Sequence, residues 1–240
     1  MTSHGRNTTL HRIAAPKKVP VLRRIAHYLV KSQPGPHPFK ESVPLLVALR
    51  DILGMTRNKH ETKTILEKRK VLVDGKARTK IRFPVGLMDV VSFPDAKKHY
   101  RVLFGTDGKI RLKEIVEKNS EIKLCKISNK SKIKGGKIQL NLHDGRNLIV
   151  EKDNYNTGDT LIISIPTQEI KKHLPNKKGV KVYITDGKHI GETATVTDVH
   201  PMAGSYPDRV VLQPEQGDEF ETLNKYVFVI GKDKPEIEVD

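Results

Sequence analysis

The chain lacks tryptophan, has a single cysteine and contains no long run of apolar residues. The one cysteine, Cys125, excludes an intramolecular disulfide and a multi-thiolate zinc site, and it favours a reducing compartment. Aromatic residues make up only 5% and hydrophobic residues 36% of the 240 residues, which favours several small domains over one large core. A membrane-spanning helix needs about 20 apolar residues in a row, so none is expected.

Acidic residues are also missing from the first forty positions. Eight basic residues occur there and Glu41 is the first acid, so this segment carries +8 of the chain's formal net charge of +16. The last forty residues have the opposite sign, because nine acids outnumber four basic residues. A segment that repels itself so strongly needs a polyanion, and nucleic-acid phosphates fit it best. An anionic membrane fits less well, because the apolar stripe from Leu22 to Leu29 is short.

Signatures of common enzyme active sites are absent as well. The sequence has no Gly-x-Gly-x-x-Gly dinucleotide turn, no Gly-Lys-Ser/Thr phosphate loop, no Gly-x-Ser-x-Gly elbow and no His-Glu-x-x-His pair. Cys125 lies in the alternating segment 122–126, where a buried small apolar residue is the expected role. The sequence therefore predicts no catalytic residue, no cofactor, no metal site and no small-molecule substrate.

The first forty-two residues predict little regular structure. Residues 1–18 are polar and without periodicity, which indicates an extended basic arm. A short helix is expected over about 21–31, because apolar residues recur there at helical spacing. Prolines then alternate with other residues over 33–38, a linker that excludes both helix and sheet.

Two short helices are predicted between residues 43 and 67. Apolar residues recur at helical spacing over 43–53, with Pro44 suited to the first turn and Gly54 to the position just past the end. Either Thr56 or Asn58 could cap a second helix over about 59–67. Cations in the turn between the helices are electrostatically unfavourable beside the positive N-terminal end of the second helix. Their presence therefore predicts an anionic ligand at that position.

The remainder of the chain predicts short β-strands. Asp74-Gly75 is a strong hairpin signal between 71–73 and 76–78. Further strands are expected at 89–93, 101–104, 109–112, 122–126, 138–142, 148–150, 161–165, 180–184, 195–199, 210–212 and 226–230, with one helix near 112–118 and a polar link at 166–178. Such spacing is typical of small barrels or sandwiches.

Two segments resemble known RNA-binding modules. The order of helix, basic turn, helix and the stretch VLVDGK at 71–76 resembles the S-four-type module, also called the alpha-L motif, over about 43–93. The segment around Gly187 and Gly191 resembles a KOW motif, with Ala194 where a third glycine is usual. In that motif a glycine turn between two strands of a small barrel exposes polar side chains to RNA.

The whole chain is similar to the small-subunit ribosomal protein S four family of the archaeal and eukaryotic type, and its short C-terminus resembles the archaeal members. The supporting stretches are HRIAAPK at 11–17, GPHP at 35–38, KART at 76–79, FPVGLMDVV at 83–91, IKLCK at 122–126 and FVIGK at 228–232. The resemblance implies a multi-domain, mostly β fold of the α+β class. Its implied parts are a basic N-terminal arm and short helix at 1–42, an S-four-type helix pair plus hairpin at 43–98, a central β domain at 99–170 and a C-terminal SH3-like small barrel with the KOW motif at 171–240.

The same resemblance implies a structural constituent of the small ribosomal subunit in the cytoplasm. Its expected partners are small-subunit ribosomal RNA and neighbouring small-subunit ribosomal proteins, with no membrane. An RNA-modifying enzyme, or a transient translation or transcription factor built from the same modules, remains the alternative. The expected RNA contacts are Arg6, His11, Arg12, Lys17, Lys18, Arg23, Arg24, His37, Arg57, Lys59, Lys63, Arg69, Lys70, Lys76, Arg78, Arg82, Lys188 and His189.

Overall fold

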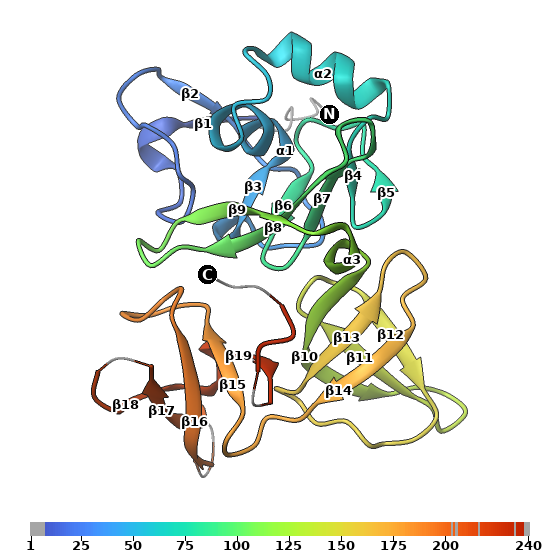
Figure 1. Cartoon of the computed structure of the whole chain (residues 1–240), viewed down its shortest axis with the longest axis vertical. Helices are drawn as coiled ribbons and strands as arrows, with labels where there is room; N and C mark the ends of the chain where they lie inside the picture. Colours follow the sequence, from blue (N-terminus) through green and yellow to red (C-terminus); the bar gives the residue numbers. More distant parts are fainter. Residues whose placement is uncertain (1–7, 203, 205, 216, 233, 238–240) are drawn as a thin grey trace, which may run out of the picture. The chain divides into compact units, whose positions relative to one another are not determined.

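The structure of the chain, a computed structural model, is mostly β with a few short helices (Figure 1). It describes residues 8–202, 204, 206–215, 217–232 and 234–237. These fall into two compact units: the described residues up to 103 together with 109–117 form the first, and 104–108 together with those from 118 onward form the second. None of the helices in the described ranges is long and apolar enough to cross a membrane.

From residue 8 onward the first unit begins with an antiparallel strand pair, and residues 1–7 of the predicted arm lie outside the described residues. β1 (Thr9–His11) pairs with β2 (Tyr28–Val30), and the 3-10 turn η1 (Arg12–Ala14) follows β1. The predicted helix over 21–31 is therefore wrong. The Arg12 guanidinium donates to the carbonyl oxygens of Leu22 at 2.7 Å and Tyr28 at 3.3 Å. A helix would need such carbonyls for its own N–H groups, so this long-range side chain overrides the helical spacing.

Two helical segments follow in the first unit. The elements are η2 (Phe39–Glu41), β3 (Ser42–Pro44), α1 (Leu45–Val47), its π-helical continuation η3 (Ala48–Ile52) and α2 (Lys59–Glu67). The first predicted helix thus begins two residues later than expected, because Pro44 ends a strand that pairs with β6 (Pro84–Gly86). The second helix has the predicted bounds. Gly54 follows the first helix with a φ of 63°, the left-handed conformation that glycine supplies past a helix end.

A five-stranded sheet completes the first unit. Its order is β5-β4-β7-β8-β9. The strands are β4 (Leu72–Val73), β5 (Lys76–Ala77), β7 (Val90–Phe93), β8 (Lys98–Phe104) and β9 (Ile110–Ile115), with the 3-10 turn η4 (Pro94–Ala96) before β8. The predicted Asp74-Gly75 hairpin is confirmed, with φ values of 50° and 70°. β8 and β9 join this sheet, although the predicted domain boundary at 98/99 separates them from it.

The second unit contains a central sheet of order β12-β11-β10-β13-β14. Its elements are α3 (Glu117–Ser120), β10 (Ile122–Lys132), β11 (Ile138–Leu142), β12 (Asn147–Val150), β13 (Thr160–Ser164) and β14 (Ile170–Leu174). Cys125 is fully buried in an apolar core with Ile127, Leu140 and Leu161, as predicted. The predicted helix near 112–118 is displaced, because β9 continues to Ile115. The predicted polar link at 166–178 contains β14, whose residues are mostly polar and half-exposed at the sheet edge.

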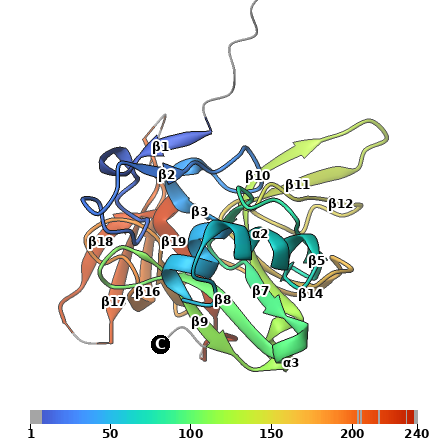
Figure 2. The same cartoon turned by 90° about the horizontal axis from the view of Figure 1, so that it is seen from above.

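A second sheet of the same unit has the order β18-β17-β16-β15-β19. Its elements are β15 (Lys181–Ile184), β16 (Thr193–His200), β17 (Arg209–Pro214), β18 (Phe220–Leu223), η5 (Asn224–Tyr226) and β19 (Val227–Gly231). Lys126 of β10 ties the two sheets together, since its Nζ donates to the carbonyl oxygens of Asn224, Lys225 and Val227 at 2.6–3.1 Å. Burial lowers the pKa of this amine to about 8. Figure 2 shows both sheets from above.

Candidate nucleic-acid interface

Arg12, predicted to contact RNA, is an internal support of the N-terminal strand pair. It is 7% exposed, and its guanidinium is bonded to two backbone carbonyls as described above. Two nitrogens of this buried guanidinium are thus bonded within the fold, where Arg12 shapes the loop that carries the neighbouring cations. RNA contact by Arg12 stays a prediction.

That loop forms a basic groove with an apolar floor. The groove has a volume of about 420 Å³, and its cationic lining comprises Lys17, Arg23, Arg24 and Lys109, with no acid. The half-buried Arg23 donates from Nη1 to the carbonyl oxygen of Ile13 at 2.8 Å, which fixes its position. Lys109 belongs to the turn before β9 and was not among the predicted contacts. Three predicted cations are thus brought together, and the fold adds a fourth.

His37, another predicted RNA contact, is also buried and bonded within the fold, and its contact with RNA stays a prediction. It is 6% exposed, and its Nε2 lies 2.9 Å from both carboxylate oxygens of Asp89. The same carboxylate accepts from the backbone N–H of Gly86 at 3.0 Å. A Cβ on Gly86 would lie 2.3 Å from the His37 ring, so only glycine leaves room for it. The GPHP segment is therefore an anchor between the linker and the sheet.

The start of α2 is a rigid, basic turn. Asn58 is the N-cap, and its side chain accepts from the Glu61 N–H at 2.9 Å. Glu61 reaches back and accepts from the Arg57 N–H at 2.8 Å, in the manner of a capping box. The hydroxyls of Thr56 and Thr62 meet at 2.8 Å beneath the turn. Of the two predicted caps, Asn58 is confirmed, and this leaves the Arg57 side chain exposed beside the helix end.

Further cations surround α2 and the adjacent hairpin, which lie side by side in Figures 1 and 2. Lys59, Arg69 and Lys76 are exposed, and no ion pair within the described ranges involves them. Lys63 pairs with Glu67 at 3.5 Å and Lys70 with Asp95 at 2.7 Å, both on the surface. Surface pairs of this kind contribute little stability, so both amines remain available to phosphates.

Arg78 and Arg82 are half-buried and serve the fold in part. The Arg78 guanidinium lies 4.4 Å from the centre of the Phe83 ring, a cation–π contact. Arg82 donates from Nε to the carbonyl oxygen of Lys31 at 2.9 Å. Each side chain retains other N–H groups, but neither is as free as those at the helix start.

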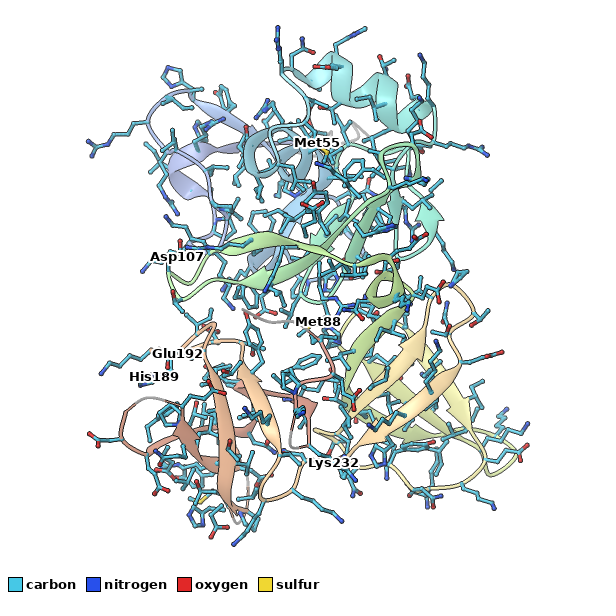
Figure 3. The ribbon with its side chains drawn as sticks, viewed as in Figure 1. Met55, Met88, Asp107, His189, Glu192 and Lys232 are labelled. Carbon is cyan, nitrogen blue, oxygen red and sulfur yellow. The ribbon has the colours of Figure 1, made fainter. Side chains whose placement is uncertain are left out.

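The loop between β15 and β16 carries the predicted KOW contacts. Lys188 is exposed, while His189 is half-buried and stacks on Phe220 with ring centres 4.0 Å apart. The Nδ1 of His189 lies 2.9 Å from Glu192, and Figure 3 shows these two residues close together. The loop thus presents one cation and an imidazole that a carboxylate and an aromatic ring hold in place.

Gly191, matched to the KOW motif, has a packing role in this loop. Its φ is 84°, and a Cβ there would lie 2.6–2.8 Å from backbone atoms of Gly105 and Thr106. Gly191→Ala is expected to destabilise the chain by about 3 kcal/mol, because backbone atoms cannot move aside and the conformation is left-handed. Thermal unfolding of the full chain measures the loss.

Gly187→Ala is the matched control, because its φ is 99° but nothing lies within 4 Å of a Cβ there. It should cost only the backbone strain of about 1 kcal/mol. Equal losses for the two variants would contradict the packing role of Gly191.

One cluster in the described ranges could be mistaken for a metal site. It comprises Cys125, His143 and Asp144, whose ligand atoms lie within 4.8 Å of one another. The Lys123 ammonium already lies 2.9 Å from Asp144, and both side chains are buried. Burial alone would raise the pKa of Asp144, but the charges of Lys123, His143 and Arg146 lower it to about 2. The Lys123 ammonium therefore occupies the position that a metal ion would need, and these residues do not fit a metal.

Comparison with known proteins gives one consistent family. The model described as ribosomal family S4e matches residues 96–170. The small ribosomal subunit protein eS4 of Methanocaldococcus jannaschii is 49% identical over 247 residues, which cover 100% of both chains. The chain belongs to the ribosomal S4e family. The eS4 protein of Methanosphaera stadtmanae is 45% identical over 237 residues, 99% of this chain and 98% of that relative.

The family also has a solved structure that resembles this one. The crystal structure of the 30S ribosomal protein S4e from Thermoplasma acidophilum is 33% identical and has a TM-score of 0.70, covering 80% of this chain and 96% of that chain. Both relatives and this neighbour come from archaea, so the resemblance stated from the sequence is confirmed.

In this S4e-family chain the predicted contacts divide by exposure. The exposed ones are His11, Lys17, Arg24, Arg57, Lys59, Lys63, Arg69, Lys70, Lys76 and Lys188. The half-buried ones are Lys18, Arg23, Arg78, Arg82 and His189. Arg12 and His37 are buried, and Arg6 lies outside the described residues. RNA contact by each of these residues stays a prediction.

Proposed function

We propose that this chain is a structural constituent of the small ribosomal subunit that binds and stabilises ribosomal RNA. The observation that carries the proposal is the capped, basic start of α2. Cations at a helix N-terminus weaken the helix, so Arg57 and Lys59 need another reason to be there. A phosphate at this position would meet backbone N–H groups, the helix dipole and both side chains at once. The names of the S4e relatives support the same role.

Within this proposal, each part of the chain has its own task. The segment from α1 through α2 to the β4–β5 hairpin acts as an S-four-type module that grips folded RNA by shape. The sheet from β15 to β19 acts as an SH3-like small barrel with a KOW loop, and the central sheet is a separate β domain. The basic cations contact phosphates and 2′-hydroxyls and so position the RNA rather than read its sequence. The partners are small-subunit ribosomal RNA and neighbouring proteins in the cytoplasm, and the role requires no catalysis.

Sedimentation tests whether the chain is a constituent. A tagged full-length chain expressed in an archaeal host should remain with small subunits through a high-salt wash, at a ratio near one per subunit. Many phosphate contacts acting together hold a constituent in place even when each is weakened by salt. Release into the supernatant at moderate salt, while other small-subunit proteins stay bound, would instead identify a transient factor.

A further inference from the structure

The strands β10, β11 and β12 turn one face to the apolar core, and β11 with its paired residues carries uncharged polar side chains on the other. Alternate residues of β11 enter the core, which turns Gln139 and Asn141 to the opposite face. The strand register places Asn129 opposite Asn141, and Asn141 opposite Asn147. Because cross-strand partners share a face, three asparagines form a row across the three strands.

A second row lies beside the first. Ser131 faces Gln139, and Gln139 faces Ile149. The face is open, since Ser131, Asn129 and Asn147 are exposed and Ile149 is 61% exposed. We call these six residues the amide face. It carries amide and hydroxyl groups, one apolar side chain and no charge.

Internal hydrogen bonds hold part of the amide face in position. Gln139 donates from Nε2 to Oδ1 of Asn141 at 2.7 Å, and Oδ1 of Asn129 accepts from the Lys130 N–H at 2.7 Å. The side chains of Ser131 and Asn147 have no hydrogen-bond partner within the described ranges. Preordered amides beside groups without partners are suited to a ligand that both donates and accepts hydrogen bonds.

Lysines border the amide face at the tip of the β10–β11 hairpin. The segment 122–143 contains six lysines and no acid. Figure 2 shows the hairpin as a long two-stranded arm. Gly135 and Gly136, both with positive φ, lie in its turn. Lys132 and Lys134 are exposed, and no ion pair among the described residues involves either. Lys132 pairs with Ile138 and so belongs to the core side, whereas strand alternation gives Lys137 the side of Gln139. Lys137 is exposed and lies 3.9 Å from Glu151, a surface pair that leaves its amine available.

We propose that the amide face and its bordering lysines form a further RNA-binding surface. The inference rests on the proposed function and adds a site that contains none of the residues predicted to contact RNA. An RNA helix presents a wide, shallow groove of 2′-hydroxyls and base edges, which donate and accept hydrogen bonds. The amide face matches that groove, and Lys134 in the hairpin turn and Lys137 beside it match the phosphates along its edge. An apolar protein surface would leave the amides without partners, so it fits less well.

A tethered cleavage probe tests where the RNA lies. Ser131→Cys places one exposed thiol on the amide face, because the native Cys125 is fully buried. With Fe(II)-EDTA attached to that thiol, the full chain bound to small-subunit ribosomal RNA should cleave the RNA at a discrete group of nucleotides. Gln213→Cys, on an exposed position of β17, is the control and should not cleave those nucleotides.

Two further variants separate the amides from the charges. Lys134→Gln with Lys137→Gln should lower the salt dependence of RNA binding, its log–log slope falling by about 1.5, since two phosphate contacts are lost. Asn147→Ala should weaken binding several-fold without changing that slope. Both should leave the melting temperature unchanged, because the side chains are exposed.

The outcomes distinguish this surface from the function on which it rests. If the chain binds ribosomal RNA but Ser131→Cys gives no cleavage, the amide face is not an RNA site and only this inference fails. If the same thiol in intact subunits crosslinks to a neighbouring protein and cleaves no RNA, the face is a protein contact and the inference is likewise overturned. If the chain binds no ribosomal RNA at all, the proposed function fails as well.

Discussion

Removing four cations around α2 and the hairpin is expected to weaken binding to small-subunit ribosomal RNA about a thousand-fold at about 0.1 M salt. The variant is Arg57→Gln, Lys59→Gln, Arg69→Gln and Lys76→Gln. Each phosphate contact contributes about 0.7–0.9 to the slope of log affinity against log salt concentration. Four lost contacts therefore reduce the magnitude of that slope by about three, and at about 0.1 M salt they lower the affinity by about three log units. Filter binding or fluorescence anisotropy over a series of salt concentrations measures both quantities.

A matched variant removes the same charge elsewhere. Lys172, Lys178, Lys181 and Arg209 each already face a carboxylate in the second unit. Changing these four to glutamine should reduce affinity by no more than a few-fold, because none of them lies at the start of α2 or on the adjacent hairpin, where the RNA is proposed to bind. A similar loss for both variants would show that net charge alone, rather than the basic turn, governs binding.

Lys123→Met is expected to lower the free energy of unfolding of the second unit by about 3 kcal/mol, since it leaves a buried carboxylate without its main partner. Lys123 and Asp144 are 0% and 1% exposed, and their charged atoms lie 2.9 Å apart. Arg146 at 3.2 Å is the remaining cation, but it is only half-buried. Guanidinium chloride unfolding of the full chain measures the change.

The pH dependence of this loss identifies its cause. The pKa of Asp144 is lowered from 3.8 to about 2 in the folded chain, so the stability it contributes is complete above pH 3.8 and disappears as pH falls through about 2. In Lys123→Met the difference from the native chain should therefore shrink across that range. Lys123→Met with Asp144→Asn should recover part of the stability at neutral pH. A loss that is independent of pH, with no recovery in the double variant, would point to packing instead.

The sequence predicts the structure correctly where that structure depends on residues close together in the chain. The bounds of α2, the Asn58 cap and the Asp74-Gly75 hairpin follow from side chains within four positions of one another. Cys125 could be assigned to a core because strand alternation is also local. The exposed cations at the start of α2 are predictable for the same reason, because the unfavourable interaction of cations with a helix N-terminus is also local.

Contacts between residues far apart in the sequence explain what the sequence did not predict. The apolar spacing over 21–31 predicts a helix, but Arg12 captures a carbonyl ten residues away and β1 pairs with β2. His37 meets Asp89, fifty-two positions later, so a conspicuous histidine in a proline-rich linker became an anchor. The row of asparagines could not be found without the register of three strands. The acid-free lysine segment at 122–143 is the available signal, but the alternation of its residues predicts only a strand.

The central claim is that this chain binds folded small-subunit ribosomal RNA mainly through its phosphates. The most direct measurement is the affinity of the purified full chain for that RNA across a tenfold range of salt. The account predicts tight binding at low salt and a log–log slope of about −4 or steeper, because at least four cations each meet a phosphate. Binding that does not change with salt, or no binding at low ionic strength, would contradict it.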